Sequence, residues 1–278
     1  MLDGGYTMIS EKIELIGKGL YEDIPDQLTL KSIPTASELD YVGSEDFEAT
    51  MLDKILPKAV EEKINFRHLL EIDFQWICRC LRIINYGPYH TTNSIYCPTC
   101  NHASYGEYNV DLRTIDCKML PEGFVNEIKI TKERFIDFDG DVTLKLMTIQ
   151  DAMNVYKDKS FVDEKGRVNK DLARMCYMIK SIKNKKNLTP LEVKMLIINT
   201  FSSADYQILK EEVASLTDYG LRAGGSTICP RCGSSEAAFI ALVDDRFFRP
   251  SVGALRQWRD DNRSGRNENS SGDKTTAV

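Results

Sequence analysis

The sequence contains two copies of one short cysteine motif, and the distance between them constrains the fold more than any other feature. The stretches YCPTCN and ICPRCG each place Cys-Pro-x-Cys after an apolar residue. We call these stretches the first and second knuckle. Between Cys100 of the first and Cys229 of the second lie 128 residues. Any fold that joins the knuckles must therefore carry a large insertion between them.

Each knuckle can present two thiolates to one metal ion. Gly233 and Asn101 follow the second cysteines, and both residue types tolerate the left-handed backbone that lets N–H groups point at the sulfurs. Two knuckles supply the tetrahedral four-sulfur set of a structural zinc site. We therefore predict one zinc ion per chain, with four ligands: Cys97, Cys100, Cys229 and Cys232.

Alternative roles for the cysteines fit the pattern less well. Iron also binds four sulfurs, and zinc is favoured in a protein without other signs of redox chemistry. A thioredoxin-type site needs only one pair, at the start of a helix. Four cysteine ligands leave no position for a catalytic water, so we expect no catalysis at this metal. Zinc ribbons commonly have about 15–20 residues between their pairs, so this chain predicts a split ribbon.

Composition narrows the class of protein. The chain has 278 residues, of which 42% are hydrophobic, so it can fill a core. Its formal charge of −6 disfavours general binding to nucleic acid. No apolar run is long enough for a membrane span, and the start lacks the pattern of a signal peptide. Eight cysteines without such a signal favour the reducing cytosol.

Periodicity predicts an α+β fold. We expect a flexible N-terminus over residues 1–16, one zinc-organised domain over 17–258, and a disordered tail over 259–278. Helical spacing marks residues 44–60 and 69–84, and the Asp139-Gly140 pair indicates a hairpin within 134–148. A helical insertion is expected over about 148–220, where Thr189, Pro190 and Glu192 form a capping-box start. Strands alternate with these helices, so the insertion between the knuckles is mixed.

Other candidate residues have ordinary structural interpretations. His68 and His90 are expected to be structural or on the surface, and the complete four-cysteine set makes His102 dispensable as a ligand. The basic run at 180–187 is interpreted as a solvated loop, with a contact to nucleic acid or an acidic partner as the alternative. No nucleophile–base set is present, so we expect no enzyme. Buried thiols are expected at four further positions: Cys78, Cys80, Cys117 and Cys176.

The order of motifs resembles a family of baseplate hub assembly proteins from contractile-tailed bacteriophages. The resemblance starts with GKGLYEDIPDQLTLKSIP and continues with a Leu-Arg-x-x-x-Tyr-Gly helix end at Leu81 to Gly87. The first knuckle, the VDL strand at 110–112, the insertion, the second knuckle and an aromatic FF-x-P end follow in turn. The match covers residues 17–250, nearly all of the expected domain.

This resemblance implies a non-enzymatic hub component or assembly chaperone that binds phage hub or tape-measure proteins. Its place would be the host cytoplasm during assembly, or the baseplate of the finished virion. No small-molecule substrate and no membrane are implied. The alternative function is a zinc-ribbon regulator that binds nucleic acid, and a thiol oxidoreductase is a third.

The FF-x-P segment is a candidate partner-binding surface. Adjacent residues of an extended chain point to opposite faces, so one ring can enter the core while the other needs different cover. Aromatic rings beside arginines are typical of interface anchors. The alternative is that both rings seal the core. The candidate residues are Arg246, Phe247, Phe248 and Arg249.

Overall fold

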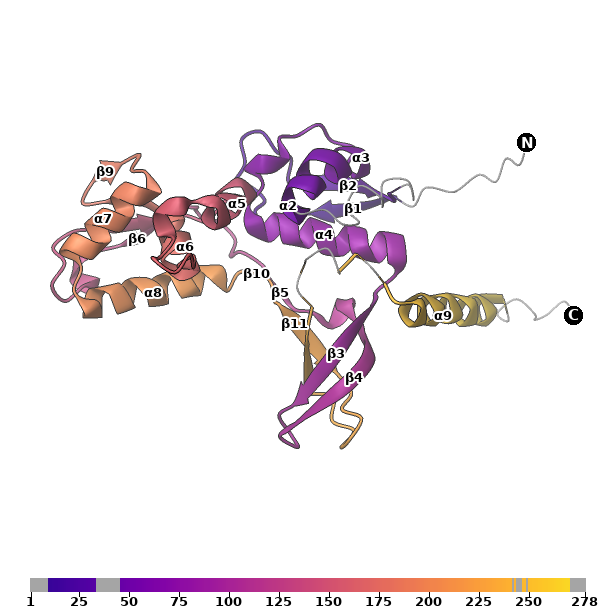
Figure 1. The fold of residues 1–278 in the computed structure, drawn as a ribbon. Coiled ribbons are helices and arrows are strands. Elements are labelled where there is room, and N and C mark those ends of the chain that lie inside the picture. Colours follow the sequence, from indigo (N-terminus) through magenta and orange to yellow (C-terminus); the bar gives the residue numbers. More distant parts are fainter. Residues whose placement is uncertain (1–9, 34–45, 242, 244–246, 249, 271–278) are drawn as a thin grey trace, which may run out of the picture.

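The computed structural model has a mixed α+β fold with several small sheets (Figure 1). It describes residues 10–33, 46–241, 243, 247–248 and 250–270, with side chains as far as 261. Antiparallel pairing accounts for every ladder in these ranges. The predicted α+β class is therefore confirmed.

The N-terminal part is a hairpin followed by a helical segment. Strand β1 (Ser10–Glu14) pairs with β2 (Gln27–Lys31), and the side chains of Ile13 and Leu15 are buried. The expected flexible N-terminus is therefore wrong from residue 10 onward, while residues 1–9 lie outside the described residues. Elements α2 (Phe47–Thr50), η1 (Met51–Ile55) and α3 (Leu56–Ala59) then form the helical run predicted from periodicity.

Helix α4 (Glu71–Tyr86) is the central element of the fold. Its apolar stripe is buried, and the helix contacts the N-terminal hairpin as well as β10 (Gly220–Leu221) and α5 (Ile149–Lys157). The helix ends at Gly87, whose φ of 75° suits glycine far better than other residues. Three of its polar side chains, Asp73, Arg79 and Arg82, are also buried.

Each of these three buried side chains fixes a different segment. Asp73 accepts hydrogen bonds from the backbone N–H groups of residues 16 and 17, and Arg79 donates to the carbonyl oxygen of Leu112 in η3 (Leu112–Thr114). Arg82 reaches the chain after Gly87 and the distant FF-x-P end. Helix α4 therefore positions segments from both ends of the chain through hydrogen bonds as well as apolar packing.

Both knuckles belong to one four-stranded sheet. Strands β3 (Tyr89–Cys97) and β4 (His102–Asp111) form one hairpin, and β11 (Gly224–Thr227) and β12 (Ala237–Ile240) form another. The sheet order is β11-β12-β3-β4. Figure 1 shows this sheet projecting from α4, away from the N-terminal hairpin. A short pair of β5 (Cys117–Lys118) and β10 (Gly220–Leu221) lies where the chain leaves and re-enters this region.

The insertion contains a second sheet and four helices. Strands β6 (Ile128–Ile130), β7 (Val142–Leu144), β8 (Ile179–Ile182) and β9 (Lys185–Lys186) pair in sequence order. Helices α5 (Ile149–Lys157), α6 (Lys170–Met178), α7 (Pro190–Thr200) and α8 (Ser203–Thr217) account for most of the rest. Short elements η4 (Lys132–Arg134) and η5 (Lys159–Phe161) also lie in the insertion, whereas η2 (Phe66–His68) precedes α4. The capping box at Thr189 is present as predicted.

The expected hairpin at Asp139-Gly140 is wrong in register. The strands that pair are β6 and β7, so residues 131–141 form a longer connection instead of a two-residue turn. Phe135 and Phe138 leave the strand path because their rings pack against Phe201, with Phe138 stacked at 4.1 Å between ring centroids. The basic run at 180–187 forms the β8–β9 hairpin, in which Lys183 and Asn184 at the turn have positive φ.

The C-terminal segment is helical where a disordered tail was expected. Helix α9 (Val252–Ser270) contacts β3, and Tyr89 donates a hydrogen bond to Asp261. The ring of Trp258 lies against Gly87, where an added Cβ would come within 2.4 Å of it. The low apolar content of this segment gave no sign of a helix in the sequence, because a single aromatic side chain, Trp258, makes the contact with Gly87. Residues 271–278 lie outside the described residues.

Candidate metal centre

The first knuckle is the turn of the β3–β4 hairpin. Cys97 is the last residue of β3 and pairs with His102, the first residue of β4. Asn101 has a φ of 48°, the left-handed conformation predicted from its position. Tyr96 donates a hydrogen bond to the Asn101 side chain at 2.8 Å, which helps hold the turn.

The second knuckle occupies the loop between β11 and β12. Gly233 has a φ of 74°, and its N–H donates to the carbonyl oxygen of Cys229 at 2.9 Å. The N–H of Cys229 donates in turn to the carbonyl oxygen of Ser234 at 2.7 Å. Both knuckles therefore follow the pattern expected from sequence, with a left-handed residue directly after the second cysteine.

Sheet pairing brings the two knuckles face to face. Strand β12 is hydrogen-bonded to β3 with Ala238 opposite Tyr96, which places both turns at the same end of the sheet. Thr99 of the first knuckle contacts the side-chain hydroxyl of Ser234 at 3.0 Å and donates to Glu236 at 2.9 Å. The knuckles are thus joined by direct polar contacts as well as by the strands.

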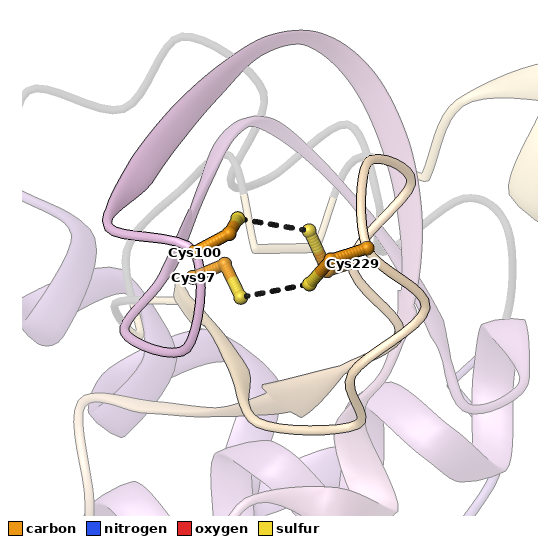
Figure 2. Close-up of side chains that lie close together, drawn as sticks. Cys97, Cys100 and Cys229 are labelled. Carbon is orange, nitrogen blue, oxygen red and sulfur yellow. Dashed lines mark hydrogen bonds between the residues drawn. The ribbon is translucent and has the colours of Figure 1, made fainter.

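All four predicted ligands come together. The Sγ atoms of Cys97 and Cys232 are 3.6 Å apart, and those of Cys100 and Cys229 are 3.9 Å apart (Figure 2). All four lie within 4.8 Å of one another. A tetrahedron with Zn–S bonds of about 2.3 Å has sulfur–sulfur edges of about 3.8 Å. The spacing is therefore compatible with a zinc site, whereas a disulfide would need about 2.05 Å.

Backbone donors prepare two of the sulfurs as thiolates. The N–H of Cys100 donates to Cys97 and lowers its pKa to about 6. The N–H of Cys232, helped by that of Arg231, likewise lowers the pKa of Cys229. In each knuckle it is the first cysteine whose thiolate is stabilised. Burial raises the pKa of Cys100 to about 12, and the pKa of Cys232 is raised as well, so the second cysteine of each knuckle would release its proton on binding a metal ion.

The remaining cysteines lie apart from this cluster. Burial raises the pKa of Cys80 and of Cys176 to about 12, and Cys78 is fully buried. Cys117 is half-buried, so the prediction of a buried thiol holds only in part there. Within the described residues, no other group of three or more His, Cys, Asp or Glu side chains has metal-binding spacing. His102 is next to the first knuckle but is not part of that set.

The candidate partner-binding segment does not lie on the surface. Phe247 and Phe248 have 0% and 2% of their surface exposed. Phe248 packs against Phe47 and Phe247 against His90, with ring centroids 5.9 and 5.7 Å apart. Both rings therefore belong to the core, and their assignment as interface anchors is wrong in this conformation. Arg246 and Arg249 lie outside the described residues.

Arg82 is a key residue that sequence reasoning used only as part of a motif. It is fully buried and donates to the carbonyl oxygens of Phe247, Gly87 and Tyr89 at 2.7–2.8 Å. The available signal was a long cationic side chain within an otherwise apolar helical stripe. Such a side chain is buried only when its donors are paired.

No helix in the described residues has the length and apolar character needed to cross a membrane. Comparison of the chain with protein-family models, with curated proteins and with solved structures finds no match.

Proposed function

We propose that the four cysteines bind one structural zinc ion and that the two hairpins form a split zinc ribbon. The observation that carries this proposal is the near-tetrahedral spacing of four sulfurs from two hairpins. Four protein ligands fill a tetrahedral coordination shell, so the ion has no position for substrate or water. The site therefore serves the fold and performs no reaction.

The ion would close a loop of 128 residues between Cys100 and Cys229. A chain that brings together residues 129 positions apart loses conformational entropy, and binding energy released only in the folded state offsets that loss. The zinc ion holds the two ends of the insertion together, so that the insertion leaves and returns at one place. Its helices and second sheet can then act as one body attached to α4.

At the level of biology, we propose a non-enzymatic role in assembling the baseplate hub of a contractile-tailed phage, through protein–protein binding. The support is the resemblance carried by the ordered motifs from residue 17 to residue 250. The contacts of Arg82 give a physical reason for two of these motifs to occur together, since it links the Tyr-Gly helix end to the FF-x-P segment.

Affinity capture of the full-length protein from infected cells, followed by mass spectrometry, tests this role. Recovery of hub or tape-measure proteins is the expected result. The Cys100→Ser variant should lose them, because the fold it presents is impaired, while the matched Cys117→Ser variant should retain them. Recovery of only metabolic enzymes or nucleic acid from the wild-type protein would contradict the proposal.

The two alternatives have their own tests. A nucleic-acid regulator would shift labelled DNA with a steep dependence on salt, which the net charge of −6 disfavours. A thiol oxidoreductase would turn over a disulfide substrate, and zinc loading would inhibit it. The lowered pKa values of Cys97 and Cys229 beside the raised ones of Cys100 and Cys232 speak in its favour, whereas the gathering of all four sulfurs within 4.8 Å favours metal binding.

A further inference from the structure

The sheet that carries the knuckles has one buried face and one exposed face. Residues directly opposite each other on antiparallel strands point to the same face, and successive residues alternate. Ile95, Cys97, Ala237 and Phe239 face the core and are at most 3% exposed. Tyr96 and Ala238, which are paired, face the other way and are exposed.

The ladder registers define the rest of the exposed face. Ala103 is opposite Tyr96, and Tyr105 is opposite Ser94. Ser226 is opposite Ala238, and Gly224 is opposite Ile240. We call this surface the outer ribbon face, and it consists of eight residues: Ser94, Tyr96, Ala103, Tyr105, Gly224, Ser226, Ala238 and Ile240.

The outer ribbon face contains no charged residue, in a chain of which 28% is Asp, Glu, Lys or Arg. Its large side chains are well exposed, with Tyr105 at 82%, Ile240 at 68% and Tyr96 at 47%. Ile228, at the start of the second knuckle, is 70% exposed beside it. Tyrosine and aliphatic residues without charge are typical of interface centres rather than of solvated sheet faces.

We propose that this face binds the same face of a second copy of the chain, forming a two-fold symmetric dimer. The inference goes beyond the proposed function and does not depend on it. An uncharged surface favours an uncharged partner, because a charge buried against it would lose its hydration without gaining a counterion. The outer ribbon face is itself such a surface, and a two-fold axis sets it against its own copy with no like charges opposed.

Other exposed apolar side chains fit this role less well. Leu191, Met195 and Ile198 form a stripe on α7, but Glu192 and Lys194 on the same helix adjoin it. Two copies of that stripe would bring like charges close together in at least some registers. The strands of the outer ribbon face carry acidic residues only in the edge strand β4: Glu107, at the bulge two residues after Tyr105, and Asp111, which pairs with Arg113.

Area and shape are consistent with a modest dimer. The four large side chains are Tyr96, Tyr105, Ile228 and Ile240. Since an aromatic side chain has about 150–250 Å² of surface, their exposed fractions together amount to on the order of 500 Å². The small residues between them add to this, toward the roughly 800 Å² per partner of a standard interface. Two sheets can stack face to face about 10 Å apart, as in a sandwich. Figure 1 shows the sheet projecting from the helices.

Sedimentation velocity on the purified, zinc-loaded full chain tests the proposal across micromolar to submillimolar concentrations. The wild-type chain should dimerise. Ile240→Glu and Tyr105→Glu should each weaken dimerisation at least about tenfold, since each buries a carboxylate at the contact. Met195→Glu, a matched substitution at an exposed apolar residue of α7, should leave the dimer unchanged. Circular dichroism and zinc content verify that all three variants fold.

Two results would overturn the dimer. One is a wild-type chain that stays monomeric at every concentration. If such a monomeric chain instead binds a different protein from infected cells through the outer ribbon face, the dimer is overturned as well. The other is a dimer that both face variants retain. Because the measurement uses the purified chain alone, its outcome is separate from that of the hub-assembly proposal, which the capture experiment tests.

Discussion

At the scale of single residues, the fold depends on side chains that stabilise it through contacts with residues distant in the sequence. The four cysteines could be found from sequence because the local CPxC pattern specifies both the turn and the chemistry. Arg82 could not, because its role depends on carbonyl groups at 87, 89 and 247 that no local pattern connects. Phe247 and Phe248 were misassigned for the same reason, since the partners that bury both rings are remote in sequence.

The ligand cysteines should separate from the structural cysteines on substitution. Cys100→Ser and Cys232→Ser should abolish stoichiometric zinc binding and destabilise the protein by more than about 4 kcal/mol, the range seen when a metal is lost. Cys117→Ser, outside the cluster, should retain about one zinc ion per chain and most of its stability. Elemental analysis and thermal unfolding measure the two quantities. Equal losses in all three variants would contradict a specific site.

Replacing Arg82 by methionine should cost about 3 kcal/mol or more. The substitution keeps an unbranched apolar stem but leaves three carbonyl oxygens without their donor, at about 1–3 kcal/mol for each buried group. The control is Arg113→Met, because Arg113 is exposed and its guanidinium pairs with the carboxylate of Asp111, for an expected cost under about 1 kcal/mol. Urea unfolding compares the two variants. Similar midpoints would show that the buried hydrogen bonds are not important.

At the scale of elements, periodicity and capping gave reliable predictions where an element is stabilised by its own residues. Helix α4 and the capped start of α7 are examples, since the stripe and the Thr189 box are written in consecutive residues. Strand β1 and helix α9 were missed because each is held by another segment. A five-residue strand needs its partner β2, and α9 needs the surface at Gly87 on which Trp258 lies.

The contact between α9 and the end of α4 can be measured with two glycines. Gly87 and Gly19 both have a φ of 75°, but only Gly87 has the Trp258 ring against it, whereas Gly19 has open space. Substitution by alanine should cost about 1 kcal/mol at Gly19 from backbone strain, and clearly more at Gly87 because the ring must move.

Removing residues 250–278 provides the second half of this test. In the shortened chain, the cost of Gly87→Ala should fall to that of Gly19→Ala, because the ring is gone. Thermal unfolding of the unsubstituted chain, Gly19→Ala and Gly87→Ala, each in full-length and shortened form, gives the comparison. A Gly87→Ala cost that persists in the shortened chain would show that Trp258 is not its cause.

At the scale of the whole molecule, the knuckles and the insertion form regions with different sources of stability. The four-stranded sheet at the knuckles carries the four-cysteine cluster at one end, where the proposed zinc ion would hold it. The insertion has its own buried residues and the ring cluster of Phe135, Phe138 and Phe201. Locally organised regions can open separately, so the two need not unfold together.

Removal of the metal should therefore affect the molecule unevenly. After treatment with a chelator, amide hydrogen exchange should rise first and most in β3, β4, β11 and β12. Helices α6, α7 and α8 should keep more of their protection, because their packing does not involve the cysteines. Exchange measured by mass spectrometry resolves these segments. A uniform rise across both regions would mean that the metal and the insertion form one cooperative unit.

The 128 residues between the knuckles also set an order of events during synthesis. The first pair of cysteines leaves the ribosome long before the second, and at about 5–20 residues per second the delay is on the order of ten seconds. Throughout that interval the first pair has no partner pair, while the entire insertion emerges and can begin to fold. The FF-x-P segment and α9 emerge later still, and the proposed metal centre can close only after the whole insertion has been made. When the four cysteines come together, every residue between the two hairpins has therefore already been synthesised.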